Sequence, residues 1–183
     1  MTKDELWDLN LKISATQSMA KDDKWMADSD WEEFILLMNL KNPQSYGSLI
    51  QNRIIKVMNG DKVKPSLNRG DIKINNEYFE IKASILTPTN KVMNLVQIRL
   101  WQDIAGYCCF AFDVRVKNNF QIHQYYLTHD EMVSEVELLG SSAHGTKIIT
   151  AENKHNEKAI RIAIEDSDPN FMRWNTIYKH QML

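Results

Sequence analysis

The sequence of 183 residues has little of several features that mark particular classes of protein. Its two cysteines, Cys108 and Cys109, are adjacent, and neighbouring residues of a strand point to opposite faces, so we expect small buried residues and no disulfide framework. No run approaches the ~18–20 apolar residues that a membrane span needs. The charged start Met-Thr-Lys-Asp-Glu lacks an apolar stretch, which predicts no signal peptide. A reducing cytoplasm is therefore the expected setting.

Excess charge of either sign is also absent. The 22 Lys and Arg residues and 24 Asp and Glu residues give a net charge of −2. This balance counts mildly against nucleic-acid binding, although a local basic cleft, or one assembled in a dimer, can bind phosphates within a near-neutral chain. Repeats, low-complexity tracts and linkers are lacking as well, so the length favours a single domain over residues 1–183.

The expected elements follow one another as helices, then strands, then further helix and strands. The predicted parts are a helical part (1–60), a sheet that carries the candidate site (61–127) and a C-terminal part of helix, loop and strands (128–183). This order predicts an α/β (α+β) fold with a central mixed β-sheet flanked by helices. Helices are predicted over 2–20, 29–42, 44–58, 128–139 and from 169, with capping boxes at Thr2–Glu5, Ser29–Glu32 and Thr128–Glu131; strands are predicted over 71–74, 77–82, 92–100, 106–116, 120–127, 148–149 and 159–164.

The most informative segment is a pair of short alternating runs joined by Asn75-Asn76. Asparagine tolerates the positive φ of a two-residue turn, so the segment predicts a β-hairpin. If the residues beside the turn pair, Asp71 faces Glu80, and both acids share one face with Lys82. The opposite face is almost entirely apolar, which places it against a core.

Two directly opposed carboxylates repel each other, so this face predicts a bound cation. Hard oxygen ligands suit Mg²⁺, with Asp71 and Glu80 holding it. Lys82 would then orient a water or stabilise charge that develops on a phosphate. The chemistry is metal-assisted hydrolysis of a phosphodiester. The alternative is a solvated hairpin face on which Lys73 and Lys82 neutralise two surface acids.

Asn68-Arg69-Gly70-Asp71, followed by Phe79-Glu80-Ile81-Lys82-Ala83-Ser84, resembles the active-site core of the PD-(D/E)XK nuclease superfamily. Segments 97–102 and 139–146 resemble parts of small type II restriction endonucleases in that superfamily. Gly70 stands where the family has proline. The resemblance implies a restriction-endonuclease-like core in which Asp71, Glu80 and Lys82 are catalytic, and in which Asp71, Glu80 and the backbone carbonyl of Ile81 bind Mg²⁺.

The same resemblance implies a Mg²⁺-dependent, sequence-specific endodeoxyribonuclease of the prokaryotic cytoplasm. Its substrate would be double-stranded DNA, cut to 5′-phosphate and 3′-hydroxyl ends. A homodimer would read a symmetric site, and a cognate DNA methyltransferase would belong to the same system. Two alternatives remain: a structure-specific nuclease for junctions or repair, and a non-catalytic nucleic-acid-binding or protein-interaction domain of the same fold.

A helix-borne side chain is a further candidate for the metal site, since members of the superfamily often use a helix-borne acid near the metal. Glu32 or Glu33 could serve as that ligand, and both also fit a solvated helix face. Gln51, on the next predicted helix, is a neutral substitute.

Candidate DNA contacts lie in two segments. Gln97 and Arg99 are predicted on the polar face of strand 92–100, opposite Val96 and Ile98. Arg99 fits a phosphate contact and equally a structural ion pair, for example with Asp103. The small-residue loop 140–146 fits either a DNA groove or a plain surface loop. Its candidate side chains are Ser141, Ser142 and His144.

Overall fold

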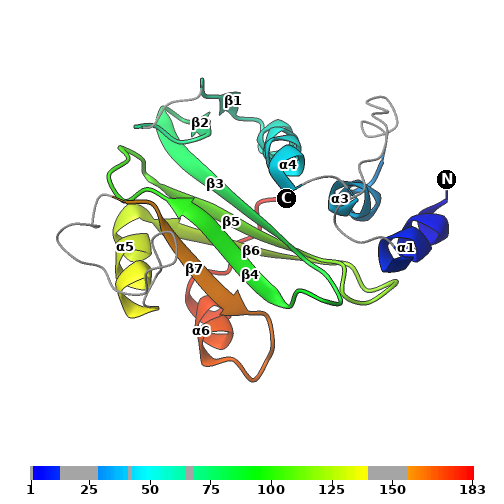
Figure 1. Cartoon of the computed structure of the whole chain (residues 1–183). Coiled ribbons are helices and arrows are strands. Elements are labelled where there is room, and N and C mark those ends of the chain that lie inside the picture. The colour runs from blue at the N-terminus through cyan, green and yellow to red at the C-terminus, as the bar shows by residue number, and fades with distance from the viewer. Residues whose placement is uncertain (1, 13–28, 41–42, 65–67, 140–155) are drawn as a thin grey trace.

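The computed structural model describes residues 2–12, 29–40, 43–64, 68–139 and 156–183 (Figure 1). The described helices are α1 (Lys3–Lys12), α3 (Trp31–Asn39), α4 (Pro43–Val57), α5 (His129–Leu138) and α6 (Pro169–Ile177). The described strands are β1 (Asp61–Lys62), β2 (Ile72–Ile74), β3 (Glu77–Leu86), β4 (Val92–Ile98), β5 (Gly106–Asp113), β6 (Gln121–Thr128) and β7 (Lys158–Ala163).

Five strands form the central sheet in the order β1-β2-β3-β5-β6. Strands β3 and β5 are parallel, and the other neighbours in this sheet are antiparallel. Strands β4 and β7 form a separate antiparallel pair. The predicted α+β class, with a mixed central sheet flanked by helices, is confirmed.

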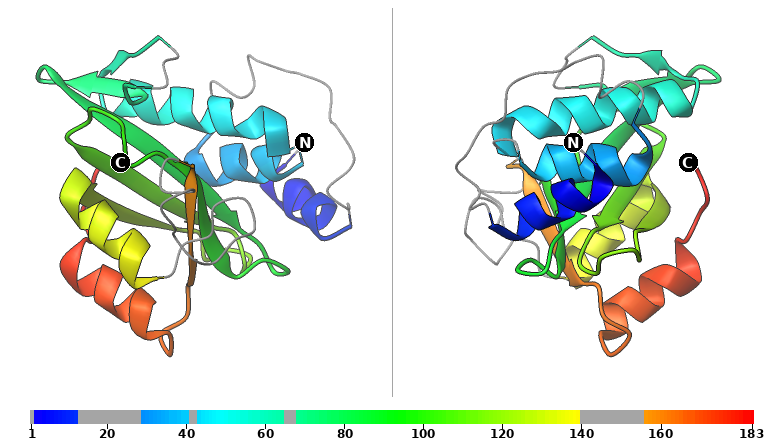
Figure 2. Two further views of the ribbon diagram at one scale, coloured as in Figure 1. Left: turned by 60° about the vertical axis from the view of Figure 1, so that its left-hand side comes forward. Right: turned by 90° about the vertical axis from the view of Figure 1, so that its right-hand side faces the viewer.

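Each face of the central sheet carries its own hydrophobic cluster. One face packs against α1, α3 and α4, and the other against β4, β7, α5 and α6 (Figures 1 and 2). Side chains of β5 alternate between the two clusters, with Cys108 in the first and Cys109 in the second. Both thiols are free and buried, as predicted.

The hairpin forms in the predicted register from the turn to Ile72. Asn75 and Asn76 have φ values of 50° and 70°, so both adopt the left-handed conformation that a two-residue turn needs. Ile72 pairs with Phe79. On β3, Ile81 joins the cluster under α3 and α4. The residues on either side of it therefore point to the opposite face, toward β4.

Several predicted boundaries change in the structure. The capping box of α3 uses Asp30 and Glu33, one residue later than predicted, because Asp30 has the extended backbone of an N-cap and accepts the Glu33 N–H. The box at Thr128 is confirmed. Of the helix predicted over 2–20, residues 3–12 are helical, and 13–20 lie outside the described residues, as do 148–149. Within the described part of the chain, no helix is long and apolar enough to cross a membrane.

Candidate active site

Asp71 lies at the end of the β2–β3 pairing, where the chain leaves the regular ladder. Its backbone N–H donates to the carbonyl of Phe79 (2.8 Å), a residue that already pairs with Ile72. Its carboxylate accepts the backbone N–H of Ile81 (2.9 Å). The predicted opposition of Asp71 and Glu80 is therefore altered: the pairing ends at Ile72, and Asp71 reaches over β3 beside Glu80 and Ile81.

Gly70 allows this close approach. A Cβ atom at this position would overlap the carbonyl group of Phe79 and crowd the backbone nitrogen of Glu80. These are backbone atoms of a paired strand, so they cannot move aside as a flexible side chain would. Gly70 thus lets the segment before Asp71 lie directly on β3.

Glu80 and Lys82 are buried on the face of β3 that points toward β4. Their exposed fractions are 4% and 8%. The ammonium of Lys82 donates to the Glu80 carboxylate at 2.8 Å and to the backbone carbonyl of Gln97 at 2.9 Å. The predicted shared face of Glu80 and Lys82 is confirmed. The alternative of a solvated hairpin face is wrong for these two residues.

A bulge in β4 directs the Gln97 carbonyl to Lys82. The β4–β7 register shifts between Leu95 and Ile98, and Gln97 has a φ of 54°. The bulge also changes which side chains are buried: Leu95 and Ile98 are buried, whereas Val96 and Gln97 are both exposed. The predicted regular alternation over 92–100 is therefore wrong beyond Leu95, since one inserted residue reverses the faces.

Arg99 forms an ion pair, although not with the predicted partner. Its guanidinium lies 2.7 Å from the carboxylate of Glu157, which precedes β7. Asp103 instead donates its backbone N–H to Asn68. The sequence separation of 58 residues between Arg99 and Glu157 explains why local pattern could not identify this pair.

Gln102 is a site residue for which the sequence predicted no role. Its amide nitrogen lies 3.3 Å from Glu80 Oε2 and 3.3 Å from the carbonyl of Arg69. The side chain is buried, and its Oε1 has no hydrogen-bond partner among the described residues. Its position in the segment 97–102 that resembles restriction enzymes was the one available signal.

The helix-borne side chain near Asp71 is Gln51 of α4, whose amide acts to lower the pKa of that carboxyl against the effect of burial. The other two candidates have different partners. Glu32 accepts hydrogen bonds from Lys3 and Trp7 of α1, and Glu33 caps its own helix. Among the described contacts, neither glutamate reaches the two site carboxylates, so the neutral alternative describes this site.

The electrostatics of the site favour a cation. Burial, and next the charge of Glu80, raise the pKa of Asp71 above its usual value. The Ile81 N–H, the charge of Lys82 and the Gln51 amide lower the pKa, but they do not offset these two effects. The described residues hold no cluster of three or more His, Cys, Asp or Glu side chains that could bind a metal. The oxygen atoms that could coordinate a metal ion here belong to two carboxylates and to nearby amide and backbone groups. The side-chain oxygen of Gln102, which has no hydrogen-bond partner among the described residues, is one of these amide oxygens. Hard oxygen donors of this kind suit Mg²⁺.

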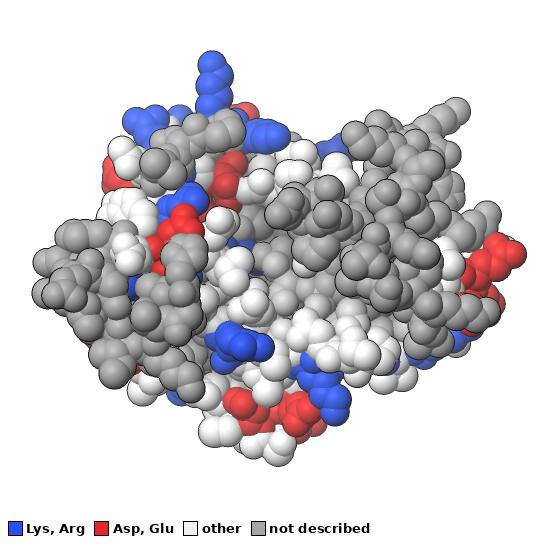
Figure 3. Space-filling model, viewed as in Figure 1, with Lys and Arg blue, Asp and Glu red and all other residues white. Residues whose placement is uncertain are grey.

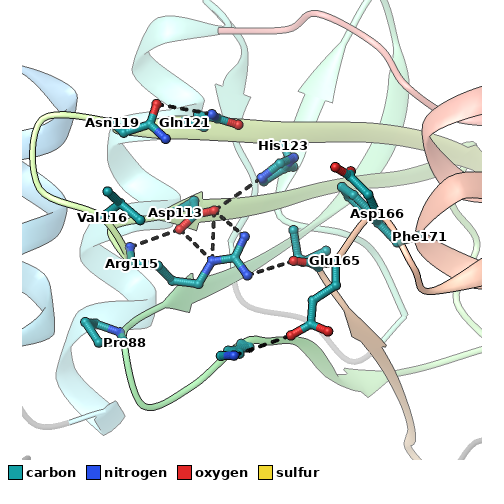
Figure 4. A pocket seen from close by; sticks show the side chains of 12 residues that line it. Pro88, Asp113, Arg115, Val116, Asn119, Gln121, His123, Glu165, Asp166 and Phe171 are labelled. Carbon is teal, nitrogen blue, oxygen red and sulfur yellow. Dashed lines mark hydrogen bonds and ion pairs between the residues drawn. The ribbon is translucent and has the colours of Figure 1, made fainter.

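A cavity of about 590 Å³ lies at the far end of β5, away from these residues (Figure 4). Its wall is an ion-pair cluster: Arg115 binds both carboxylate oxygens of Asp113 and donates to the Ile164 carbonyl, and His123 lies 3.6 Å from Asp113. Burial alone would raise the pKa of Asp113, but the nearby His123 and the hydrogen bonds from Arg115 outweigh it and lower the pKa. These contacts join β5 to β6 and to the end of β7, which is a structural role.

The remaining predicted DNA contacts, Ser141, Ser142 and His144, lie outside the described residues. Comparison with models of known protein families gives no match to this chain. A search of curated proteins gives no match either.

Proposed function

We propose that this protein is a Mg²⁺-dependent, sequence-specific endodeoxyribonuclease, most like a type II restriction enzyme. One observation carries the proposal: a buried lysine ammonium is paired with Glu80, next to Asp71, whose pKa is raised by burial and by the neighbouring carboxylate. A buried acid and a half-buried acid held close together with a lysine are unusual in a purely structural role, because their repulsion costs stability.

Asp71 and Glu80, with the backbone carbonyl of Ile81, would hold Mg²⁺. The ion would supply positive charge against a phosphate oxygen and lower the pKa of a bound water. Gln102 would orient Glu80, to which it donates a hydrogen bond, and Gln51 would help to position Asp71, whose pKa its amide lowers. Their neutral amides add no further negative charge to the site.

Lys82 would act on the attacking water. An ammonium has three donors, and two are used by Glu80 and the Gln97 carbonyl. The third is left for a water or a phosphate oxygen. Attack of the water oxygen on phosphorus, with loss of a water proton to solvent and breakage of the bond to the 3′ oxygen, leaves a 5′-phosphate, and the 3′ oxygen takes up a proton from solvent to become the hydroxyl.

A plasmid cleavage assay with Mg²⁺ tests the proposal. The expected result is a set of discrete fragments, and the variants Asp71→Asn and Lys82→Met should reduce the cleavage rate by about a hundredfold or more. Lys117→Gln, in the turn between β5 and β6, removes an equal charge at the far end of β5 and should cut normally.

Other outcomes would contradict the proposal in different ways. Cleavage restricted to branched DNA would indicate a structure-specific nuclease, and binding without cleavage would indicate a non-catalytic domain. The proposed homodimer predicts paired cuts in both strands of a symmetric site, which sequencing of the cut ends would reveal.

A further inference from the structure

A hollow of about 440 Å³ beside β1 and β2 is lined mainly by cations. In the view of Figure 3, Lys and Arg side chains gather at the upper left, over β1 and β2. We call this lining the β1–β2 basic surface. Its residues are Lys62, Lys64, Arg69 and Lys73, together with Asp61, Val63 and Tyr78.

Cations outnumber acids in this surface, as the structure describes it. None of its four cations takes part in an ion pair between described residues, and Asp61 is the one carboxylate in the lining. Four like charges around one hollow repel one another unless an anion lies between them. Since the whole chain has a net charge of −2, this concentration of positive charge is local.

Tyr78 holds two of the cations in place. The guanidinium of Arg69 lies over its ring, 4.8 Å from the centroid, and donates to its hydroxyl at 2.9 Å. Lys73 lies 5.8 Å from the same ring. A planar guanidinium that is already oriented loses less freedom when it binds a phosphate. Arg69 and Lys73 are therefore preorganised for an anionic group.

The surface lies next to the candidate active site, both along the chain and on β3. Arg69 precedes Gly70 and Asp71 directly, and Gln102 joins the Arg69 carbonyl to the Glu80 carboxylate. Tyr78 precedes Glu80 by two residues on β3, so both side chains lie on one face. A polyanion on the basic surface would therefore lie close to the segment that carries Asp71 and Glu80.

We infer that the β1–β2 basic surface binds the sugar–phosphate backbone of duplex DNA next to the phosphate that is cut. The choice of duplex DNA rests on the proposed function. The binding itself needs neither metal nor cleavage, because it comes from lysine and arginine charges that displace counterions from the phosphates. Such contacts position the duplex and do not read its sequence.

The test is the salt dependence of DNA binding by the full chain in EDTA, measured by fluorescence anisotropy with a short labelled duplex. Removing one cation that binds a phosphate reduces the steepness of log K against log salt by about 0.9. Lys64→Gln and Lys73→Gln should each reduce it by that amount, and Arg69→Gln should reduce it at least as much. Lys117→Gln should leave the slope unchanged.

Unchanged slopes in the three surface variants, or an equal change in Lys117→Gln, would overturn the inference. So would tighter binding of an RNA duplex of equal length, or displacement of DNA by inorganic phosphate at constant ionic strength. If the surface variants leave the salt dependence unchanged while cleavage still depends on Lys82, the inference about the surface is wrong and the proposed function stands. Shallower slopes without any cleavage would support the surface and contradict the nuclease.

Discussion

The ammonium of Lys82 on β3 donates to the backbone carbonyl of Gln97 on β4 across 2.9 Å. The contact joins the central sheet to the β4–β7 pair at the candidate active site. It depends on the bulge that gives Gln97 a left-handed backbone. The conformation of a single exposed residue thereby fixes the orientation of a buried catalytic candidate.

Substitutions at Gln97 separate its backbone from its side chain. Gln97→Gly keeps the left-handed conformation at little cost, whereas Gln97→Val should lose about 1–3 kcal/mol, because a β-branched residue resists positive φ. Urea unfolding and plasmid cleavage measure both effects. We expect the valine variant to cut more slowly and the glycine variant to cut normally. Loss of cleavage with normal stability in the glycine variant would instead show that the side chain contacts DNA.

Gly70→Ala should displace Asp71. The new methyl group would overlap the Phe79 carbonyl, so we expect a loss of about 1–3 kcal/mol in the free energy of unfolding and strongly reduced cleavage. Gly47→Ala is the matched control, since an added Cβ there meets no heavy atom within 4 Å and α4 gains about 1 kcal/mol from alanine. An alanine at position 70 that leaves stability and cleavage unchanged would contradict the close packing.

Asp71→Asn should stabilise the metal-free protein at neutral pH. The pKa of Asp71 is raised in the folded state, so folding is favoured while the carboxyl is protonated, below its ordinary pKa of about 3.9. That contribution is lost as pH rises through the raised pKa. Urea unfolding in EDTA should therefore show equal stability of the two proteins in acid, with the variant more stable at neutral pH.

Added Mg²⁺ provides the complementary measurement for Asp71. A ligand that binds only the folded protein stabilises it, so the ion should raise the midpoint of the wild type more than that of Asp71→Asn. A variant less stable than the wild type at neutral pH in EDTA would contradict the electrostatic account.

Gln51→Glu should convert the neutral helix-borne partner into a third carboxylate. We expect the Mg²⁺ affinity measured by calorimetry to rise about tenfold, because the number of charged oxygen ligands sets the affinity of such sites. The free energy of unfolding of the metal-free protein should fall, because the new carboxylate repels Asp71. Gln121→Glu adds the same charge at the exposed start of β6 and should change neither quantity. Equal behaviour of the two variants would remove Gln51 from the site.

Features that depend on near neighbours in the chain were predicted well. The Asn75-Asn76 turn, the capping box at Thr128 and the start of α6 at Pro169 all form as the sequence indicates. In each, the residues that determine the structure lie within about four positions of one another. Backbone preference and local hydrogen bonds are then sufficient.

Features that depend on distant residues were not predicted. The bulge at Gln97 arises where β4 meets β7, and the contact of Gln102 with Glu80 arises from packing against the hairpin. The partner of Arg99 likewise comes from far along the chain. None of these interactions leaves a periodic signal in the sequence.

By itself the sequence determined the fold class, the hairpin register up to Ile72, and which two acids and which lysine stand close together. Only the tertiary structure decided that Glu80 and Lys82 are buried, that Asp71 reaches over β3, and that cations gather beside them. Which side chains are neighbours along a strand follows from local backbone geometry. The burial of a charged group and its electrostatic environment depend instead on all the helices and strands that pack around it.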